Sequence, residues 1–201
     1  MDKETYRRIA LARRDAIPPG IAQQKSARIR QRVLRLSAFR KAGCVLGYVS
    51  VRSEVSTRKL LADVLAAGKR LALPLVRQGE RELSAHAVSD LGTLVHGPFG
   101  IPSPDPARHP SVDPGAIDLV MVPGVGFDRR GFRLGYGFGY YDAFLGRLRG
   151  RATLVGLAFR EQLFDYLPQA AHDVPVDILV TDAGAFWPIQ PALNAGGSLR
   201  P

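Results

Sequence analysis

The chain has 201 residues and a formal net charge of +10, and 46% of its residues are hydrophobic, enough for one core of ordinary size. No apolar run approaches the roughly 20 residues that a helix needs to span a bilayer, so we expect no membrane association. The N-terminus carries alternating charges and no apolar signal block, which predicts a cytoplasmic protein. A single cysteine, Cys44, cannot form a disulfide within the chain.

The positive charge is concentrated near the N-terminus. Residues 1–42 hold 12 Lys and Arg against 3 Asp and Glu, whereas the rest of the chain holds 16 against 15. This excess favours the solvated faces of two helices, although it could also attract a polyanionic small molecule or a nucleic acid. The histidines do not fall at metal-ligand spacings, so we assign none of them to a metal.

The N-terminal part of the chain is predicted to be helical. Apolar residues recur at helical spacing over 3–16 and again over 21–37, with Pro18-Pro19-Gly20 between them. Residues 44–49 then form a short apolar run, typical of a strand that is covered on both faces. The sheet is therefore expected to begin only after two amphipathic helices.

Helix and strand alternate from that point. Ser56 is the expected N-cap of a helix that Gly68 ends. The elements expected after it are strands over 70–76 and 82–88, an ordered surface loop without regular structure over 97–104, a strand over 117–122, a glycine-rich loop over 124–139, a helix over 140–148, and strands over 152–158 and 176–181.

This alternation predicts an α/β fold: a single three-layer α/β/α domain with a mostly parallel sheet, over residues 1–187. Ligands of such sheets gather at the carboxyl ends of the strands. Residues 188–201 are expected to form a disordered tail.

The glycine-rich loop runs from the end of one strand to the start of a helix. Glycines at 135, 137 and 139 remove side chains at alternate positions, so the backbone could approach an anion closely and point N–H groups at it. The N-terminus of the following helix adds its partial positive charge. The alternative is that these glycines only make tight turns.

Two charged residues flank the glycines. Arg133 could pair with phosphate oxygens, and Asp142 could hold a magnesium ion on them. The stretch lacks the Gly-Lys-Ser/Thr of a P-loop and the glycine spacing of a dinucleotide fingerprint. We therefore predict a phosphate site of another kind.

Residues 122–142 strongly resemble the signature of the 5-formyltetrahydrofolate cyclo-ligase family, also called methenyltetrahydrofolate synthetases. The resemblance covers roughly residues 3–182 and includes Lys3, Arg7, and the segments 52–57, 97–102 and 174–177. The chain departs from the family pattern at Phe138, where glycine is usual, at Ser103, where glutamate is usual, and at His86, near a common tryptophan.

The resemblance implies ATP-dependent conversion of 5-formyltetrahydrofolate, which could be polyglutamylated, to 5,10-methenyltetrahydrofolate, with ADP and phosphate as products. ATP would be a co-substrate, bound with Mg²⁺. A formamide oxygen is a poor leaving group, so it must be phosphorylated before N10 can close the ring. Such a transfer depends on positioning and charge neutralisation more than on a covalent protein nucleophile.

The family's functional residues map onto this chain as three groups. The implied ATP-binding residues are Lys3, Arg7, Arg133, Leu134, Gly135, Tyr136, Gly137, Phe138, Gly139, Tyr140 and Tyr141. The implied substrate residues are Glu54, which would accept hydrogen bonds from the pterin, and Tyr140. The implied magnesium ligands are Asp142 and Asp177.

Each implied role has a structural alternative. Lys3 and Arg7 share a helix face and could simply be solvated there. The adjacent tyrosines could be ordinary packing at a helix start, Asp177 a capping or turn residue, and Glu54 a surface carboxylate.

Two other functions are weighed against the cyclo-ligase. One is a non-catalytic folate or nucleic-acid binding module, suggested by the departures and by the basic helices. The other, more remote, is a sugar-phosphate or coenzyme A enzyme on a related fold.

Overall fold

The computed structural model describes residues 1–76, 83–97, 100–137 and 139–188. Phe138 and the predicted tail beyond residue 188 therefore lie outside the described residues. Within the part of the chain that the structure describes, none of the helices is both long and apolar enough to cross a membrane.

Eight strands form one mixed sheet, in the order β13-β12-β10-β7-β1-β2-β3-β6. The five neighbours from β12 to β2 are parallel, and β13, β3 and β6 are added at the edges through antiparallel pairing. The strands are β1 Cys44–Leu46, β2 Arg70–Val76, β3 Leu83–Ala87, β6 Ser111–Val112, β7 Leu119–Val122, β10 Thr153–Ala158, β12 Ile178–Thr181 and β13 Ala185–Phe186.

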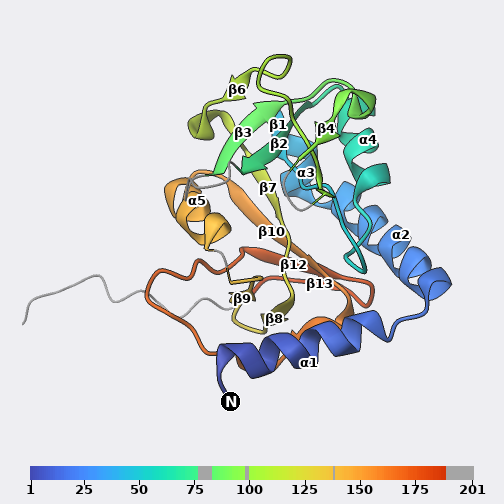
Figure 1. Ribbon diagram of the computed structural model, residues 1–201, viewed down its shortest axis with the longest axis vertical. Helices are drawn as coiled ribbons and strands as arrows, with labels where there is room; N and C mark the ends of the chain where they lie inside the picture. The colour runs from blue at the N-terminus through green and yellow to red at the C-terminus, as the bar shows by residue number, and fades with distance from the viewer. Residues whose placement is uncertain (77–82, 98–99, 138, 189–201) are drawn as a thin grey trace, which may run out of the picture.

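Helices cover both faces of this sheet (Figure 1). One face carries α2, α3 and α4, and the other carries α5. The helices are α1 Lys3–Asp15, α2 Pro19–Arg35, α3 Ser37–Lys41, α4 Arg58–Ala66 and α5 Tyr140–Leu148. The predicted α/β fold with a mostly parallel sheet is confirmed.

The two cores follow from the alternation of side chains along each strand. On β7, Leu119 and Met121 lie in the core under α2 and α4, whereas Val120 and Val122 lie in the core under α5. All four side chains are fully buried, which is why a continuous apolar run, and not an alternating one, marks this strand in the sequence.

Two segments that the sequence analysis treats as loops contain short strands. The glycine-rich loop over 124–139 holds β8 Gly126–Asp128 and β9 Arg133–Leu134, which form a small sheet with β11 Leu163–Phe164. The turn-rich passage over 97–104 contains β5 Pro102–Ser103, paired with β4 Val95–His96. A two-residue edge strand tolerates proline, because it needs few backbone donors.

The expected N-cap of the third long helix is displaced by one residue. The residue before α4 is Thr57 and not Ser56. The Thr57 hydroxyl donates to the Tyr48 carbonyl at 2.6 Å and accepts from the Ser50 amide at 3.0 Å. These bonds fasten the loop after β1 to the helix start, so that loop is held rigidly.

The order of the strands defines where ligands should bind. The chain moves from β1 to β2 through α4 in one direction, and from β7 to β10 through α5 in the other. Because β1 and β7 are neighbours, the carboxyl ends of these two strands are the topological switch point of the sheet. The loop 48–57 leaves β1 there, and the glycine-rich stretch leaves β7 there.

Candidate functional site

The glycine-rich stretch lies between two guanidinium groups, one from α1 and one from β9. Arg7 donates from Nε to the Gly135 carbonyl at 2.9 Å. A Cβ atom on Gly135 would lie 2.7 Å from Arg133 Nη1, and one on Gly137 would lie 3.4 Å from Arg7 Nη2. The glycines therefore allow two cations to approach the backbone closely, as an anion site requires.

Positive backbone φ angles explain why two of the glycines are needed. Gly137 has φ +102° and Gly139 has φ +75°, a region that side-chain-bearing residues rarely adopt. Gly139 is the N-cap of α5, so the turn brings the positive end of that helix to the loop.

Arg133 is buried at the centre of this arrangement. Its Nη2 donates to Asp142 Oδ1 at 2.7 Å, and its guanidinium lies 5.5 Å from the centre of the Tyr141 ring. Among the described residues, its buried Nε has no hydrogen-bond partner. A buried cation with an unused donor is a feature that a bound anion would satisfy.

The two predicted magnesium ligands lie at different ends of the sheet. Asp142 is in the first turn of α5 beside Arg133, beyond the carboxyl end of β7. Asp177 precedes β12, and its Oδ2 accepts from the Leu154 amide at 2.8 Å, at the amino end of β10. In the described part of the chain no three His, Cys, Asp or Glu side chains gather as a metal site. The structure thus does not bring Asp142 and Asp177 together.

Glu54 is fixed in the loop after β1 and contacts the glycine-rich stretch. Its Oε2 accepts from the Val51 amide at 3.0 Å, and its Oε1 accepts from the Tyr136 hydroxyl at 3.3 Å. Burial raises the pKa of Glu54, and the Val51 amide and Arg14 act against that rise. This carboxylate is partly buried and hydrogen-bonded, and is not a freely solvated surface group.

Three further predicted residues have defined places. Lys3 donates to Asp173 Oδ2 at 2.6 Å. Leu134 is buried, and its carbonyl accepts from the Val125 amide, so neither its side chain nor its carbonyl faces an open site. Tyr140 is the first residue of α5.

Sequence reasoning missed Arg14, which is 2% exposed. Arg14 contacts both the loop after β1 and the glycine-rich stretch. Its Nε donates to Ser53 Oγ at 3.0 Å, and its Nη2 donates to the Tyr136 hydroxyl at 3.0 Å. The spacing of seven residues from Arg7 places both on one face of α1 and was the available signal. The neighbouring Arg52 has φ 51°, a conformation that is uncommon outside glycine and often marks functional loops.

Two departures from the family pattern have structural roles. Ser103 is buried and donates to the Ile101 carbonyl at 2.9 Å. His86 is buried on β3, where Nδ1 bonds the His109 carbonyl at 2.8 Å. His86 pairs with Leu73 of β2, and Ser103 pairs with Val95 of β4. The third departure, Phe138, is outside the described residues.

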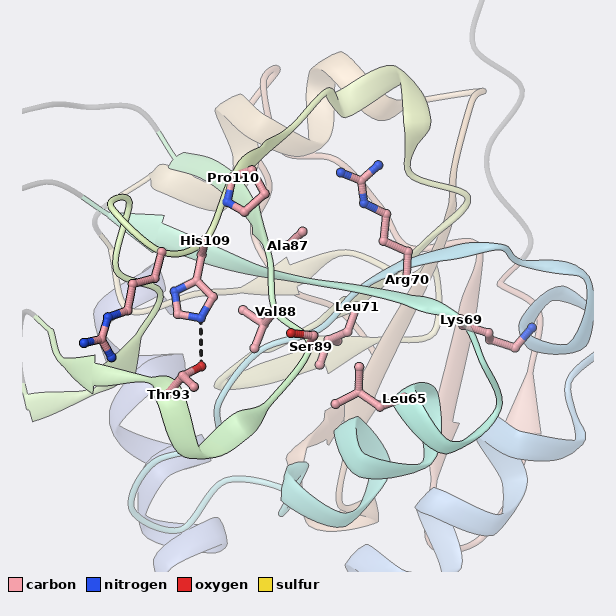
Figure 2. Close-up of a pocket in the computed structure, with 11 residues that line it drawn as sticks. Leu65, Lys69, Arg70, Leu71, Ala87, Val88, Ser89, Thr93, His109 and Pro110 are labelled. Carbon is pink, nitrogen blue, oxygen red and sulfur yellow. Dashed lines mark hydrogen bonds between the residues drawn. The ribbon is translucent and has the colours of Figure 1, made fainter.

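A cavity of about 410 Å³ lies elsewhere, at the amino end of β2 (Figure 2). Figure 2 shows His109, held by Thr93 at 2.9 Å, on one side and Leu65 below, while Lys69 and Arg70 extend in different directions at its edge. Because β2 and β7 run parallel, this cavity is at the opposite edge of the sheet from the glycine-rich stretch. It is therefore separate from the candidate site.

The fold and the site together define an α/β protein in which a glycine-rich stretch, framed by two arginines, meets a partly buried carboxylate at the switch point of the sheet. Comparison with known proteins makes this class specific. The family model for the 5-formyltetrahydrofolate cyclo-ligase family matches residues 1–182. The chain belongs to that family.

Individual relatives agree with this membership. The chain is 32% identical over 200 residues to the mitochondrial 5-formyltetrahydrofolate cyclo-ligase of Arabidopsis thaliana, covering 88% of this chain and 72% of that protein. It is 29% identical over 182 residues to the 5-formyltetrahydrofolate cyclo-ligase of Mycolicibacterium smegmatis, covering 89% and 93%.

Solved structures give the same result. The 5,10-methenyltetrahydrofolate synthetase of Aquifex aeolicus superposes with a TM-score of 0.81 at 34% identity, over 100% of this chain and 97% of that one. The synthetase from Mycoplasma pneumoniae gives 0.73 at 24% identity, over 90% and 99%, which supports the fold.

Proposed function

We propose that this protein converts 5-formyltetrahydrofolate to 5,10-methenyltetrahydrofolate with ATP, and that the reaction takes place at the carboxyl ends of β1 and β7. The observation that carries the location is the junction of two subsites. Arg7 and Arg133 frame the glycine-rich stretch, and Tyr136 from that stretch reaches Glu54.

The glycine-rich stretch is proposed to hold the ATP phosphates. Arg133 and Arg7 would neutralise phosphate charge, while the N-terminus of α5 would direct its dipole at the same oxygens. Lys3, one helical turn before Arg7, would exchange its contact with Asp173 for a phosphate. The backbone of residues 134–137 and 139 would supply N–H donors.

Glu54 is proposed to hold the pterin. A carboxylate accepts two hydrogen bonds from paired N–H donors on a ring edge, which fixes the plane of the ring. Tyr136 lies in the glycine-rich stretch, and Tyr140 follows directly after that stretch in the sequence. Their rings would supply surfaces against which a folate could pack. The formyl group would then face the γ-phosphate.

The chemistry proceeds in two transfers. The formyl oxygen attacks the γ-phosphorus and ADP leaves, which gives an imidoyl phosphate. N10 then attacks the formyl carbon, the N10 proton is released, and the phosphate departs with the formyl oxygen. The protein's part is to hold the reacting atoms in line and to neutralise charge at Arg133 and Arg7.

Of the two predicted magnesium ligands, Asp142 fits that role. Asp142 offers a carboxylate that is 18% exposed and next to the arginine that would hold phosphate, so it would hold an ATP-bound Mg²⁺. The ion would supply neutralisation of phosphate charge. Asp177 fits less well, because its carboxylate is used at the amino end of β10.

The proposal is tested by the coupling between the two substrates. Purified protein with ATP and Mg²⁺ should release ADP only when 5-formyltetrahydrofolate is added, and a folate without the formyl group should not replace it. ADP release that is independent of the folate would reject the proposed reaction.

A cytoplasmic location is part of the proposal and can be tested by cell fractionation.

The alternative of a nucleic-acid binding module predicts that removal of residues 1–42 abolishes RNA binding with a steep salt dependence. Loss of ATP affinity in that variant, without RNA binding by the intact chain, favours the enzyme. Polyglutamate length preference is open to the same assay with defined folates.

A further inference from the structure

We propose that Arg14 is a positioning residue for the folate, which acts through the Tyr136 hydroxyl to hold Glu54 in place and in its charged form. The inference rests on the proposed function for the identity of the ligand that Glu54 binds. It deepens that function by assigning the pterin subsite a second, buried residue on α1.

The geometry is a chain of two hydrogen bonds between opposite charges. Arg14 Nη2 donates to the Tyr136 oxygen at 3.0 Å, and the Tyr136 hydroxyl donates to Glu54 Oε1 at 3.3 Å. The hydroxyl can do both, since it has one donor and two acceptor positions. Its proton is thereby directed at the carboxylate, and the charge of Arg14 polarises the bond.

Arg14 is unusual in how little solvent it meets. Its side chain is 1% exposed, although arginine is almost never fully buried unless it is paired. The contact with Asp15 is 4.0 Å long, and that partner is 61% exposed. In the described part of the chain nothing accepts from the buried Nη1. The cation is therefore incompletely compensated, which is costly unless it serves another group.

Arg14 also fixes the loop that carries Glu54. Its Nε donates to Ser53 Oγ at 3.0 Å, and Ser53 in turn donates to Asp15. Ser53 directly precedes Glu54, and Arg52 beside it has the strained φ of 51°. A single side chain on α1 thus holds both the loop after β1 and the tyrosine of the glycine-rich stretch.

The electrostatic consequence follows from the groups around Glu54. Burial raises the pKa of Glu54, whereas the Val51 amide, Arg14, the Tyr136 hydroxyl and Arg52 lower it. The charged and titratable groups that face Glu54 are Arg14 from α1, Arg52 in its own loop, Tyr136 from the glycine-rich stretch, Tyr48 after β1, and Tyr141 from α5. These tyrosines are neutral near neutral pH, and burial raises the pKa of each still further.

The sign of the effect of Arg14 is therefore defined. Removing its charge raises the pKa of Glu54 further. A protonated Glu54 loses one of its two acceptor oxygens for the ring N–H donors. On acidification, a variant without the Arg14 charge should therefore lose folate affinity at a higher pH than the unmodified protein.

Four variants separate this role from a general loss of packing. Arg14→Met removes the charge and keeps the length, and Arg14→Lys keeps the charge but loses the two-pronged donor geometry. Tyr136→Phe removes only the bridging hydroxyl. Arg8→Met, on the exposed side of the same helix, is the matched control for loss of one positive charge.

The first measurement is a titration of the Glu54 carboxyl carbon by NMR in the ligand-free protein, assigned with Glu54→Gln. We expect the pKa of Glu54 to be higher in Arg14→Met and in Tyr136→Phe than in the unmodified chain, and unchanged in Arg8→Met. If Arg14→Met does not fold, Tyr136→Phe and Arg14→Lys give the answer. Equal values in all folded variants would overturn the inference.

The second measurement is the pH profile of KM for 5-formyltetrahydrofolate. In Arg14→Met we expect KM to rise about tenfold, the size of one lost charge-assisted contact, with its acidic limb moved to higher pH. In Arg14→Lys the limb should stay near its original place while KM remains raised. A fall in stability with an unmoved limb would assign Arg14 a structural role only.

The two proposals fail in different ways. Absence of turnover by the unmodified protein rejects the proposed reaction but leaves the Glu54 titration interpretable. Normal turnover with a Glu54 titration that ignores Arg14 rejects the positioning role alone.

Discussion

Asp177 and Asp118 occupy equivalent positions at the amino edge of the sheet. Each directly precedes a parallel strand and accepts from the start of the neighbouring one: Asp118 Oδ2 from the Gly43 and Cys44 amides at 2.8 Å, and Asp177 Oδ2 from the Leu154 amide at 2.8 Å. This shared position indicates that Asp177 has a structural role at the amino ends of the strands. It accepts a hydrogen bond from an amide at the start of a strand that would otherwise lack a partner.

This comparison leads to opposite expectations for the two predicted metal ligands. Asp142→Asn should lower kcat by about two orders of magnitude, as expected when one electrostatic contact to a transition state is lost. Asp177→Ala should keep kcat and lower the free energy of unfolding by about 1 kcal/mol, the value of one hydrogen bond. Steady-state kinetics and urea denaturation measure both, and a large kcat loss in Asp177→Ala would restore it as a metal ligand.

Backbone conformation leads to opposite expectations for two glycines, Gly139 and Gly146. Gly139→Ala should destabilise the protein by about 1–2 kcal/mol and raise KM for ATP, because its φ of +75° is a left-handed conformation. Gly146→Ala, inside α5 with no atom within 4 Å of the added carbon, should stabilise the protein by about 0.5–1 kcal/mol. Thermal unfolding and ATP kinetics on both variants provide the check, and equal effects would contradict the assigned role of the turn.

The residues of the site could be predicted only in part from the sequence. Arg133 and Asp142 stand beside an unusual glycine pattern, so their proximity could be foreseen, and their 2.7 Å contact agrees with it. The seven-residue spacing places Arg14 on the same face of α1 as Arg7, but its burial could not be foreseen, because burial depends on packing against distant segments. Likewise the sequence does not reveal that Asp177 lies at the amino end of β10, away from Asp142.

At the scale of elements, α1 is the part that closes the site. It lies across the small sheet of β11, β8 and β9, away from the main helical layers (Figure 1). Tyr6 packs edge-on against Phe164 with ring centres 5.3 Å apart, while Arg7 and Arg14 reach the glycine-rich stretch. The helix thus packs against the small sheet through Tyr6 and directs the side chains of Arg7 and Arg14 to the glycine-rich stretch.

Arg7 is the residue through which α1 should affect ATP. Arg7→Met removes the bond to Gly135 and one proposed phosphate partner, so KM for ATP should rise about tenfold or more, the equivalent of one hydrogen bond to a charged group. Arg8→Met removes the same charge from the exposed side of the helix and should leave KM for ATP unchanged. Equal shifts in the two variants would indicate a diffuse effect of net charge.

The small sheet is organised by a buried carboxylate that the sequence analysis did not single out. Asp128 is fully buried and accepts from the Phe132 amide at 3.0 Å and from the Leu167 amide at 3.1 Å, while Arg130 pairs with it at 2.6 Å. These contacts turn a stretch that reads as a loop into a hairpin that presents Arg133. Hydrogen bonds to a single side chain leave no periodic signal, which is why β8 and β9 were not predicted.

At the scale of the whole molecule, the alternation of elements was enough to predict the layers. Parallel strands buried on both faces give uninterrupted apolar runs, and these runs stood out at β1, β7, β10 and β12. The strand order was not predictable, because it depends on which connections cross to which side. That order places the switch point between β1 and β7 and so brings Glu54 to the glycine-rich stretch.

The most direct test of the account is to follow the near-ultraviolet absorbance of the methenyl product in a mixture of purified protein, 5-formyltetrahydrofolate, ATP and Mg²⁺. We predict an increase that requires all of these components and that Arg133→Ala abolishes without unfolding the protein. No increase with folded protein, or undiminished activity in Arg133→Ala, would contradict the claim that this chain closes the folate ring at the carboxyl ends of β1 and β7.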